Sequence, residues 1–283
     1  MSNADEKTAI ANIALLSVGE KFITSLTEGS VLANKINSIF EGIVRELLGD
    51  DWVFSRKRVN VEDLTQINKL TVDTAPSPAS FVIGKTLTGA SSSVTCTVME
   101  RLNSTTYLVT EPSDDFTDGE TISDGTDSVD CAAGYPVVDD VLNLGQWYYG
   151  YQLPTDQLYI RGLGDVDYDK IRYPYQREGK IILTNIDDAY WHYNRWIGED
   201  ESSSVSDVTL MPVWFHRLIS ARLAHILAPN ITENQKIRTK VEIELQEAWL
   251  YAREQNGSET YHEAEYKGNN DWRDGAHNTL QSL

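Results

Sequence analysis

An internal repeat constrains the fold of this chain more than any other feature of its sequence. The stretch FVIGKTLTGASSSVTC at residues 81–96 aligns without gaps on FTDGETISDGTDSVDC at residues 116–131, 35 positions later. Two copies are too few for a solenoid, so we expect a duplicated strand-turn-strand unit that closes on itself as a small β-barrel. Prolines stand at the entrance and at the exit of this region. Residues 76–136 are therefore predicted to form an inserted β module.

Each copy of the repeat ends in a cysteine, and Cys96 and Cys131 are the only cysteines of the chain. If the copies are equivalent halves of one barrel, the two thiols occupy pseudo-symmetric and largely buried positions. In a reducing cytoplasm we expect free thiols that act as small apolar side chains. Two cysteines make no disulfide framework and, without a suitably spaced histidine pair, are too few for a structural zinc site. No metal site and no cofactor is predicted.

Helical periodicity is clearest near the two ends of the sequence. Residues 31–48 place their apolar side chains on one stripe, with Ser30 as a plausible N-cap and Gly49 as a C-cap. Ahead of them, Ile13 and Leu16 mark the apolar face of a short helix that stops abruptly at a Gly-Glu corner. The corner is expected to turn the chain back onto the longer helix.

A second pair of helices is predicted downstream. Residues 211–228 form a helix that begins with a proline and ends before Pro229. Thr232 and Gln235 then form a T-x-x-Q capping box that opens the next helix. Because the connection is short, these two helices are expected to be antiparallel neighbours.

Between the helical regions, the sequence changes to segments rich in Tyr, Trp, Ile and Leu and broken by Pro, Gly and Asp, at residues 146–163, 171–185 and 189–197. Such segments are typical of strands joined by turns, and a meander of three or four strands is the economical interpretation. The predicted fold class is α+β, with a helical bundle core, a small antiparallel sheet and the inserted barrel-like module. The predicted domains are a core of residues 1–75 and 137–257, the β module at 76–136 and an extended C-terminal tail at 258–283.

Charge and hydropathy exclude several classes of protein. The 283 residues carry a formal net charge of -19, whereas nucleic-acid binders usually present a basic face to phosphates. The sequence has no apolar run of about 18 residues, so no membrane span is expected. Its first residues carry acids and no basic flank, so no secretory signal is expected either. The expected compartment is the cytoplasm of the producing cell.

Residues able to carry out catalysis are sparse. His216 and His225 lie nine positions apart on a predicted helix, so they face opposite ways and cannot share a metal. The stretch DVDYDK at 165–170 begins like a calcium loop, but Lys170 replaces the glycine of the turn and Gln176 replaces the closing glutamate. No nucleophile has a base beside it in the sequence, although triads assemble in space. We therefore predict that the protein is not an enzyme.

Two aromatic groups and one basic cluster leave alternatives open. WYYGY at 147–151 and YWHYNRW at 190–196 could stack bases or sugars, but aromatic cross-strand pairs in a packed sheet are the favoured interpretation. Arg56, Lys57 and Arg58 could touch a phosphate. Three charges after a helix are more often a solvated loop or a contact to an acidic neighbour, and we expect one of these here.

A pattern of spaced residues runs through the start of the chain and continues in later segments. Its first positions are Asn12, Ala14, Leu15, Gly19, Glu20, Ile23, Ser25, Leu26, Ser30, Ala33, Trp52, Phe54 and Arg58. The later segments are 151–163, 178–185 with the aromatic stretch behind it, and Met211–Glu254. In this order they resemble the tail tubular protein A family, the head-to-tail adaptors of short-tailed bacteriophages. The resemblance covers most of the chain outside the β module, which is longer than a minimal adaptor needs.

The resemblance implies a structural function in a virion. It implies a homo-oligomeric ring of twelve copies in the virion neck, between the portal protein and the tail nozzle protein, assembled in the cytoplasm of the host bacterium. DNA would pass through the lumen without specific binding, and many acidic chains supply a wall that repels phosphate. The alternative is a glycan-binding or glycan-cleaving tail component, motivated by the aromatic sheet and by the carboxylates of Asp139, Asp140, Asp187 and Asp188.

The module and the tail are the expected contacts with partners. Because residues 76–136 enter and leave through neighbouring prolines, we expect the module to project outward from the ring, where it could meet a tail fibre or a capsid protein. The tail at 258–283 shows no helical or strand period. It carries Trp272 beside Arg273, residue types enriched where partners bind tightly. Since adaptors of this family extend their C-terminal segments between portal subunits, these two residues are the predicted portal-binding site.

Overall fold

The chain folds into two compact units. The computed structural model describes residues 2–131, 138–139, 142, 144–165, 172–200 and 203–279, with the backbone alone at 138–139 and 260–279. The first unit, which we call the helical unit, comprises Met1–Lys57, Asp156–Tyr159 and Asn194–Leu283. The second, which we call the strand unit, comprises Arg58–Thr155 and Ile160–Tyr193.

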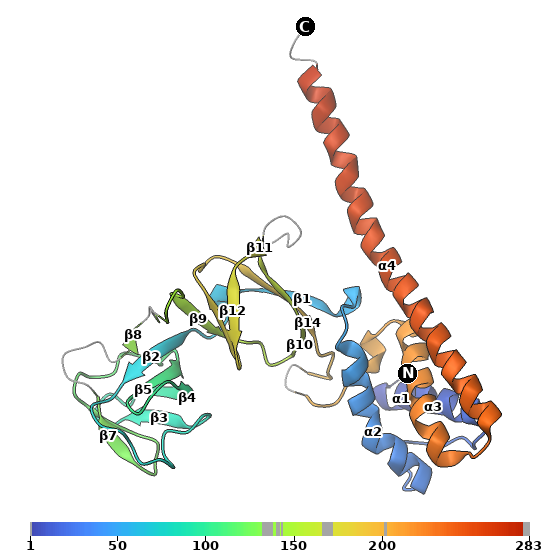
Figure 1. The fold of residues 1–283 in the computed structure, drawn as a ribbon, viewed down its shortest axis with the longest axis horizontal. Helices are drawn as coiled ribbons and strands as arrows, with labels where there is room; N and C mark the ends of the chain where they lie inside the picture. The colour runs from blue at the N-terminus through green and yellow to red at the C-terminus, as the bar shows by residue number, and fades with distance from the viewer. Residues whose placement is uncertain are drawn as a thin grey trace. The chain divides into compact units, whose positions relative to one another are not determined.

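The helical unit contains the helices labelled α1–α4 in Figure 1. Their bounds are Asn3–Val18 for α1, Val31–Leu48 for α2, Val213–Ile231 for α3 and Gln235–Thr279 for α4, with 3-10 turns η1 at Val53–Ser55 and η3 at Val208–Leu210. One hydrophobic cluster joins them, and its fully buried side chains include Ile10, Leu15, Ile36, Phe40 and Phe215. The stripe predicted at residues 31–48 is the face that α2 turns to this cluster.

The helix ends agree with the predicted capping except around the α3–α4 connection. Ser30 Oγ accepts a hydrogen bond from Ala33 N at 3.2 Å, as expected for an N-cap. Helix α3 runs through Pro229 to Ile231 instead of ending before the proline. Helix α4 is capped by Asn234, whose Oδ1 accepts from the backbone N–H of Lys236 at 3.0 Å. Asparagine is a stronger N-cap than threonine, so Asn234 caps the helix in place of the predicted capping box at Thr232.

Strands β1–β14 occupy the chain between α2 and α3 (Figure 1). Their bounds are Arg56–Asn60, Ile67–Thr71, Thr86–Gly89, Thr95–Arg101, Thr106–Thr110, Thr121–Ser123, Ser128–Asp130, Val138–Asp139, Tyr149–Gln152, Gln157–Gly164, Arg172–Tyr173, Tyr175–Glu178, Ile181–Thr184 and Tyr190–Arg195, with a 3-10 turn η2 at Val61–Asp63. They form three antiparallel sheets, in the strand orders β1-β14-β10-β11, β12-β13-β9 and β7-β6-β3-β4-β5-β2-β8.

The predicted fold class is wrong in its main element. An α+β fold with a helical bundle core and a small antiparallel sheet was expected, whereas in the described residues strands outnumber helices, form three antiparallel sheets and leave no helical-bundle core. The reason is length. The strands have two to eight residues, too few for an alternating pattern to stand out, while each helix shows several turns of its period. Arg56, Lys57 and Arg58, expected in a solvated loop or in contact with an acidic neighbour, open strand β1.

The seven-stranded sheet closes into a small barrel, as the repeat predicts. An antiparallel bridge joins Val72, just after β2, to Cys131, just after β7, and so links the two sides of the strand run. Asp73 N also donates to the backbone oxygen of Asp130 at 2.9 Å. Strand β8 pairs with the remaining part of β2. The buried interior takes apolar side chains from both repeat copies, among them Phe81, Leu87, Val94, Phe116, Ile122 and Val129.

The two repeat copies are related by an approximate two-fold axis between β3 and β6. Thr88 pairs directly with Ser123, its equivalent in the second copy. Each copy forms a hairpin outward from this axis, β3 with β4 and β6 with β7. The registers of the two hairpins differ by two residues. Leu87 pairs with the cysteine of its own copy, whereas its equivalent, Ile122, pairs with Val129. A shift of two keeps every side chain on its original face, so both halves still point their apolar residues inward.

Cys96 and Cys131 are free, buried thiols of the barrel interior, as predicted, but the difference in register gives them different partners across the hairpin. Burial raises the pKa of each thiol to about 12. Because the thiolate is the reactive form of cysteine, neither side chain is a nucleophile near neutral pH. They serve as small apolar side chains of the barrel.

The barrel is not confined to the predicted module. It begins at β2, ahead of residue 76, and Ile67 and Leu108 on its outer side belong to a cluster with Ile181 and Leu183 of β13. The barrel and the three-stranded sheet β12-β13-β9 therefore share one compact unit. The boundaries of this unit differ from the expected division at residues 76 and 136.

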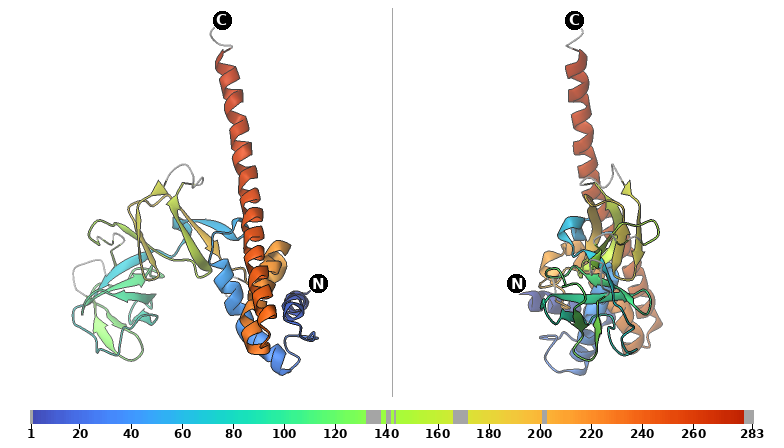
Figure 2. Two further views of the ribbon diagram at one scale, coloured as in Figure 1. Left: turned by 45° about the vertical axis from the view of Figure 1, so that its right-hand side comes forward. Right: turned by 90° about the vertical axis from the view of Figure 1, so that its left-hand side faces the viewer.

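Helix α4 extends far beyond the part of it that packs on α3 (Figure 2). Its backbone stays helical to Thr279, so residues 258–279 are not extended as expected. The stretch contains no proline, and its Glu, Ala, Lys and Arg residues favour continuing a helix that is already nucleated upstream. The helix is therefore explained by the helix propensity of these residues, although the stretch has no periodic apolar face.

Candidate functional site

An aromatic cluster holds the helices of the helical unit together. Trp52 is 2% exposed, and its ring centroid lies 5.4 Å from that of Phe215 and 5.8 Å from that of Trp249. The indole N–H of Trp52 donates to the backbone oxygen of Leu47 at 2.6 Å. Asn256 adds a polar tie, since its Oδ1 accepts from the backbone N–H at position 53 at 2.7 Å. The end of α2 is therefore fixed against α3 and α4.

A partly buried ion pair fastens α1 to α2. Lys7 Nζ lies 2.6 Å from Glu41 Oε1, and the lysine side chain is almost fully buried. The second oxygen of Glu41 accepts from the backbone N–H of Ser206 at 2.8 Å. Breaking such a pair leaves an uncompensated buried charge, so the arrangement resists separation of these segments.

The abrupt corner after α1 has a clear local cause. Gly19 takes the left-handed conformation, with φ of 81°, and ends the helix. Asn12 then clamps the returning chain, because its Oδ1 accepts from Ile23 N at 2.9 Å and its Nδ2 donates to Ile23 O at 3.0 Å. Ile23 and Leu26 are consequently buried in the helical core.

Glu28 fixes the rest of the corner. Its carboxylate accepts hydrogen bonds from the hydroxyl of Ser30, at 2.6 Å, and from both the hydroxyl and the N–H of Thr24, each at 2.7 Å. These hydrogen bonds lower the pKa of Glu28 to about 2. The corner is thus held rigid while it presents Phe22 and Val31, both largely exposed, to the surroundings.

Helix α1 is apolar on two opposite faces. Its inner face contributes Ile10 and Leu15 to the core. Its outer face carries Ala9, Ile13 and Leu16, which we call the α1 stripe; all three are exposed, and Ile13 and Leu16 are 53% and 64% exposed. Ile13 and Leu16, predicted to form the apolar core face of this helix, therefore point outward. A helix that is apolar all round is normally covered on both sides.

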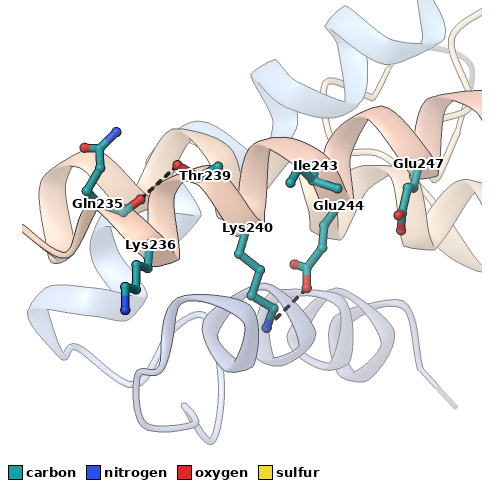
Figure 3. A pocket seen from close by; sticks show the side chains of 7 residues that line it. All are labelled: Gln235, Lys236, Thr239, Lys240, Ile243, Glu244 and Glu247. Carbon is teal, nitrogen blue, oxygen red and sulfur yellow. Dashed lines mark hydrogen bonds and ion pairs between the residues drawn. The ribbon is translucent and has the colours of Figure 1, made fainter.

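A groove runs along the first turns of α4 (Figure 3). It has a volume of about 540 Å³ and is lined by Gln235, Lys236, Thr239, Lys240, Ile243, Glu244 and Glu247, which we call the α4 groove. Lysines stand at its start and glutamates at its end, with Ile243, 51% exposed, between them. Lys240 and Glu244 form an exposed ion pair at 3.3 Å. Leu250, one heptad after Ile243 and 71% exposed, continues the apolar line.

Glu120 joins the two repeat copies of the barrel. It stands where the first copy has Lys85. Its Oε2 accepts from the N–H and hydroxyl of Ser91 and from the N–H of Ser92, and its Oε1 accepts from the hydroxyl of Ser92 and the N–H of Thr117, at 2.6–3.0 Å. Burial alone would raise the pKa of this carboxyl, but the hydrogen bonds outweigh burial and lower it to about 2.

The histidines and acidic stretches weighed in the sequence have structural surroundings. His216 Nε2 lies 2.7 Å from the backbone oxygen of Val208. Groups of three or more His, Cys, Asp or Glu side chains that could hold a metal are absent from the described residues. Most of the stretch at 165–170 lies outside those residues, as do Asp140 and the side chain of Asp139, while Asp187 and Asp188 are exposed.

The aromatic and basic groups have mostly structural contacts. Trp191 and Tyr193 are buried in the core of the strand unit, so the packed-sheet interpretation holds for them; Tyr148 is exposed. Arg56 pairs with Asp51 at 3.0 Å and Lys57 with Asp156 at 3.0 Å, which are contacts to acidic neighbours, as expected. Trp272 and Arg273 lie within the bounds of α4, and their side chains are outside the description.

Some of these surfaces leave a signal in the sequence, and others do not. The i, i+4, i+7 spacing of Ala9, Ile13 and Leu16 is visible in the sequence. Comparing the apolar residues on both faces of α1 would have shown two apolar faces, of which only one can face the core. Glu120 could not have been found in this way, since two of its partners lie near residue 91. Its only mark in the sequence is a change of charge between the repeat copies.

No model of a known protein family matches this chain, and no curated protein matches it significantly. None of the described helices is both long enough and apolar enough to cross a membrane. The surfaces described above are therefore interpreted from their own chemistry.

Proposed function

We propose that this protein is a structural head-to-tail adaptor, which forms a homo-oligomeric ring between the portal protein and the tail nozzle protein in the neck of a short-tailed bacteriophage. The observation that carries the proposal is the α1 stripe. An apolar face on a helix whose opposite face is already in the core is stabilised when a neighbouring molecule covers it. A neighbouring copy in a ring provides that cover. The sequence resemblance to the tail tubular protein A family supports the same function.

The charge of the chain suits a conduit for DNA better than a DNA-binding protein. It has 43 acidic side chains against 24 basic ones, and Arg56 and Lys57 are paired with carboxylates. Repeated over about twelve copies, this charge repels the phosphates of a passing duplex. DNA then moves through the lumen without specific contacts.

Two regions serve the partners in this proposal. The C-terminal part of α4 and the residues after it bind the portal, with Trp272 as the anchor and Arg273 paired to a portal carboxylate. The barrel faces away from the lumen, toward a tail fibre or a capsid protein. The helical unit forms the ring itself, because it carries the exposed apolar side chains of α1 and α4.

Electron microscopy of the purified protein, alone and with the portal protein of the same phage, tests the proposal. We expect rings, or rings bound to the portal, with about twelve copies. A protein that stays monomeric and does not bind the portal would contradict the adaptor function. A monomer that digests polysaccharide would instead support the glycan-cleaving alternative.

Truncation after Asn256 tests the proposed portal contact. The truncated chain keeps the Asn256 hydrogen bond to residue 53 and the aromatic cluster, so it is expected to fold. It should no longer attach to DNA-filled heads. The full chain with Trp272→Ala is the matched variant and should attach more weakly, by roughly the 2 kcal/mol or more of an interface anchor. Normal attachment of both proteins would exclude the anchor.

A further inference from the structure

The α1 stripe and the α4 groove have complementary patterns of charge and apolar side chains. On α1, Glu6 precedes Ile13 by seven residues; on α4, Lys236 precedes Ile243 by the same number. Seven residues of helix span about 10.5 Å. When two helices lie side by side in the same direction with Ile13 against Ile243, a carboxylate therefore comes beside an ammonium group.

The second end of each surface matches as well. Beyond Ile13 the chain of α1 leads to Leu16 and, just past the helix, to the exposed Lys21. Beyond Ile243 the α4 groove ends in Glu244 and Glu247. In the parallel arrangement Leu16, three residues past Ile13, lies along the apolar line between Ile243 and Leu250. In the antiparallel arrangement Glu6 moves to the acidic end of the groove instead.

We propose that the α1 stripe of one copy of this chain packs, in parallel, into the α4 groove of a second copy. The inference rests on the proposed function and names the contact between neighbouring copies of the ring. Because the two surfaces differ, the contact is heterologous, and each copy offers one groove and one stripe. Repetition of such a contact generates a closed ring when the rotation between copies closes.

A second copy fits the groove better than other occupants. A polyanion such as nucleic acid would meet Glu244 and Glu247 in the same groove as the two lysines. A single helix supplies all the lining side chains, and the exposed Ile243 and Leu250 lie one heptad apart on it, which is the spacing that a packed partner helix contacts. The charges at the rim set direction and register, and the apolar side chains at the centre set the strength of the contact.

A charge swap in the full-length chain tests the pairing. Glu6→Lys and Lys236→Glu should each weaken association about tenfold, and the double variant should recover most of the loss. Lys35→Glu, an exposed lysine on α2, is the matched control and should change association little. Size-exclusion chromatography with light scattering over a dilution series gives the oligomeric state, and circular dichroism verifies that each variant is folded.

Apolar variants give an independent measurement. Leu16→Asp and Ile243→Asp change exposed side chains, so the monomer should remain folded while the oligomer is lost. An oligomer that survives both substitutions, or a charge swap without recovery, overturns the proposed contact and leaves the ring itself intact. A wild-type chain that is monomeric at every concentration, both alone and with the portal, overturns this contact together with the proposed function.

Discussion

Glu120 should contribute to the acid sensitivity of the barrel, and Glu120→Gln should reduce that sensitivity. The folded protein lowers the pKa of this carboxyl from 4.5 to about 2, which corresponds to roughly 3 kcal/mol at about 1.36 kcal/mol per pKa unit. The group sits near the barrel surface, where solvent screening reduces the stabilisation to roughly 1–2 kcal/mol. The substituted amide also turns an NH2 group toward donors that need an acceptor, at a cost of the same order.

The direction of the pH effect follows from the sign of the pKa shift. A carboxyl whose pKa is depressed in the folded state stabilises the fold fully above its unfolded pKa, and this contribution is lost as pH falls through the folded value. For Glu120 the loss lies between about pH 4.5 and about pH 2. Other carboxyls of the barrel, among them Asp124 and Asp127, also have lowered pKa values, so the comparison must be made between variant and wild type.

Urea denaturation followed by hydrogen exchange of residues 86–131 measures this difference. Near neutral pH the Gln variant should be less stable than wild type by roughly 1–3 kcal/mol, and the gap should close as the pH is lowered through the window above. Glu111→Gln, at an exposed position on the same barrel, is the matched control and should leave stability nearly unchanged. A Glu120→Gln barrel that is as stable as wild type near neutral pH, with the same dependence on pH, would refute the reasoning.

Three further outcomes are expected. Gly89→Ala should destabilise the barrel by roughly 1–3 kcal/mol, because its Cβ would come within 2.7 Å of both carboxylate oxygens of Glu120; Gly42→Ala, in the open on α2, is the control, and thermal unfolding compares the two. Asn12→Ala should cost roughly 1–2 kcal/mol and speed amide exchange at Ile23, and unchanged exchange there would speak against the clamp. Cys96 and Cys131, with pKa values raised to about 12, should react with thiol reagents only after denaturation; fast labelling of the native protein would show that the barrel opens.

The barrel was predictable from the sequence because duplication doubles a weak signal. One copy of the repeat gives a strand-turn-strand pattern that many loops share, but two gapless copies show which positions are kept, and those positions, Phe81 and Val94 among them, line the interior. The closing strand β2 belongs to neither copy, so its place in the barrel could not be read from the repeat. The large number of strands was missed for the same reason, since most of the other strands are short and occur once.

The surfaces of the helical unit were harder to predict, because amphipathic spacing locates an apolar face without showing what covers it. For α2 the stripe faces the core, while on α1 the residues that appeared to form such a stripe, Ile13 and Leu16, are on the outside. The ties that set this orientation, Asn12 to Ile23 and Lys7 to Glu41, join positions whose pairing has no local signature. Only the packed structure reveals them.

The approximate two-fold axis between β3 and β6 is the symmetry of a dimer of two identical short chains, here carried by a single polypeptide. In a dimer of identical chains, equivalent positions carry identical residues, whereas the two copies within one chain can diverge. This one has done so: at equivalent positions after the conserved phenylalanine, the first copy exposes Val82 and Ile83 and the second exposes Thr117 and Asp118. Because the copies are fused and have diverged, the approximate two-fold axis relates an exposed apolar pair in the first copy to an exposed polar pair in the second. The two equivalent surfaces therefore suit different neighbours.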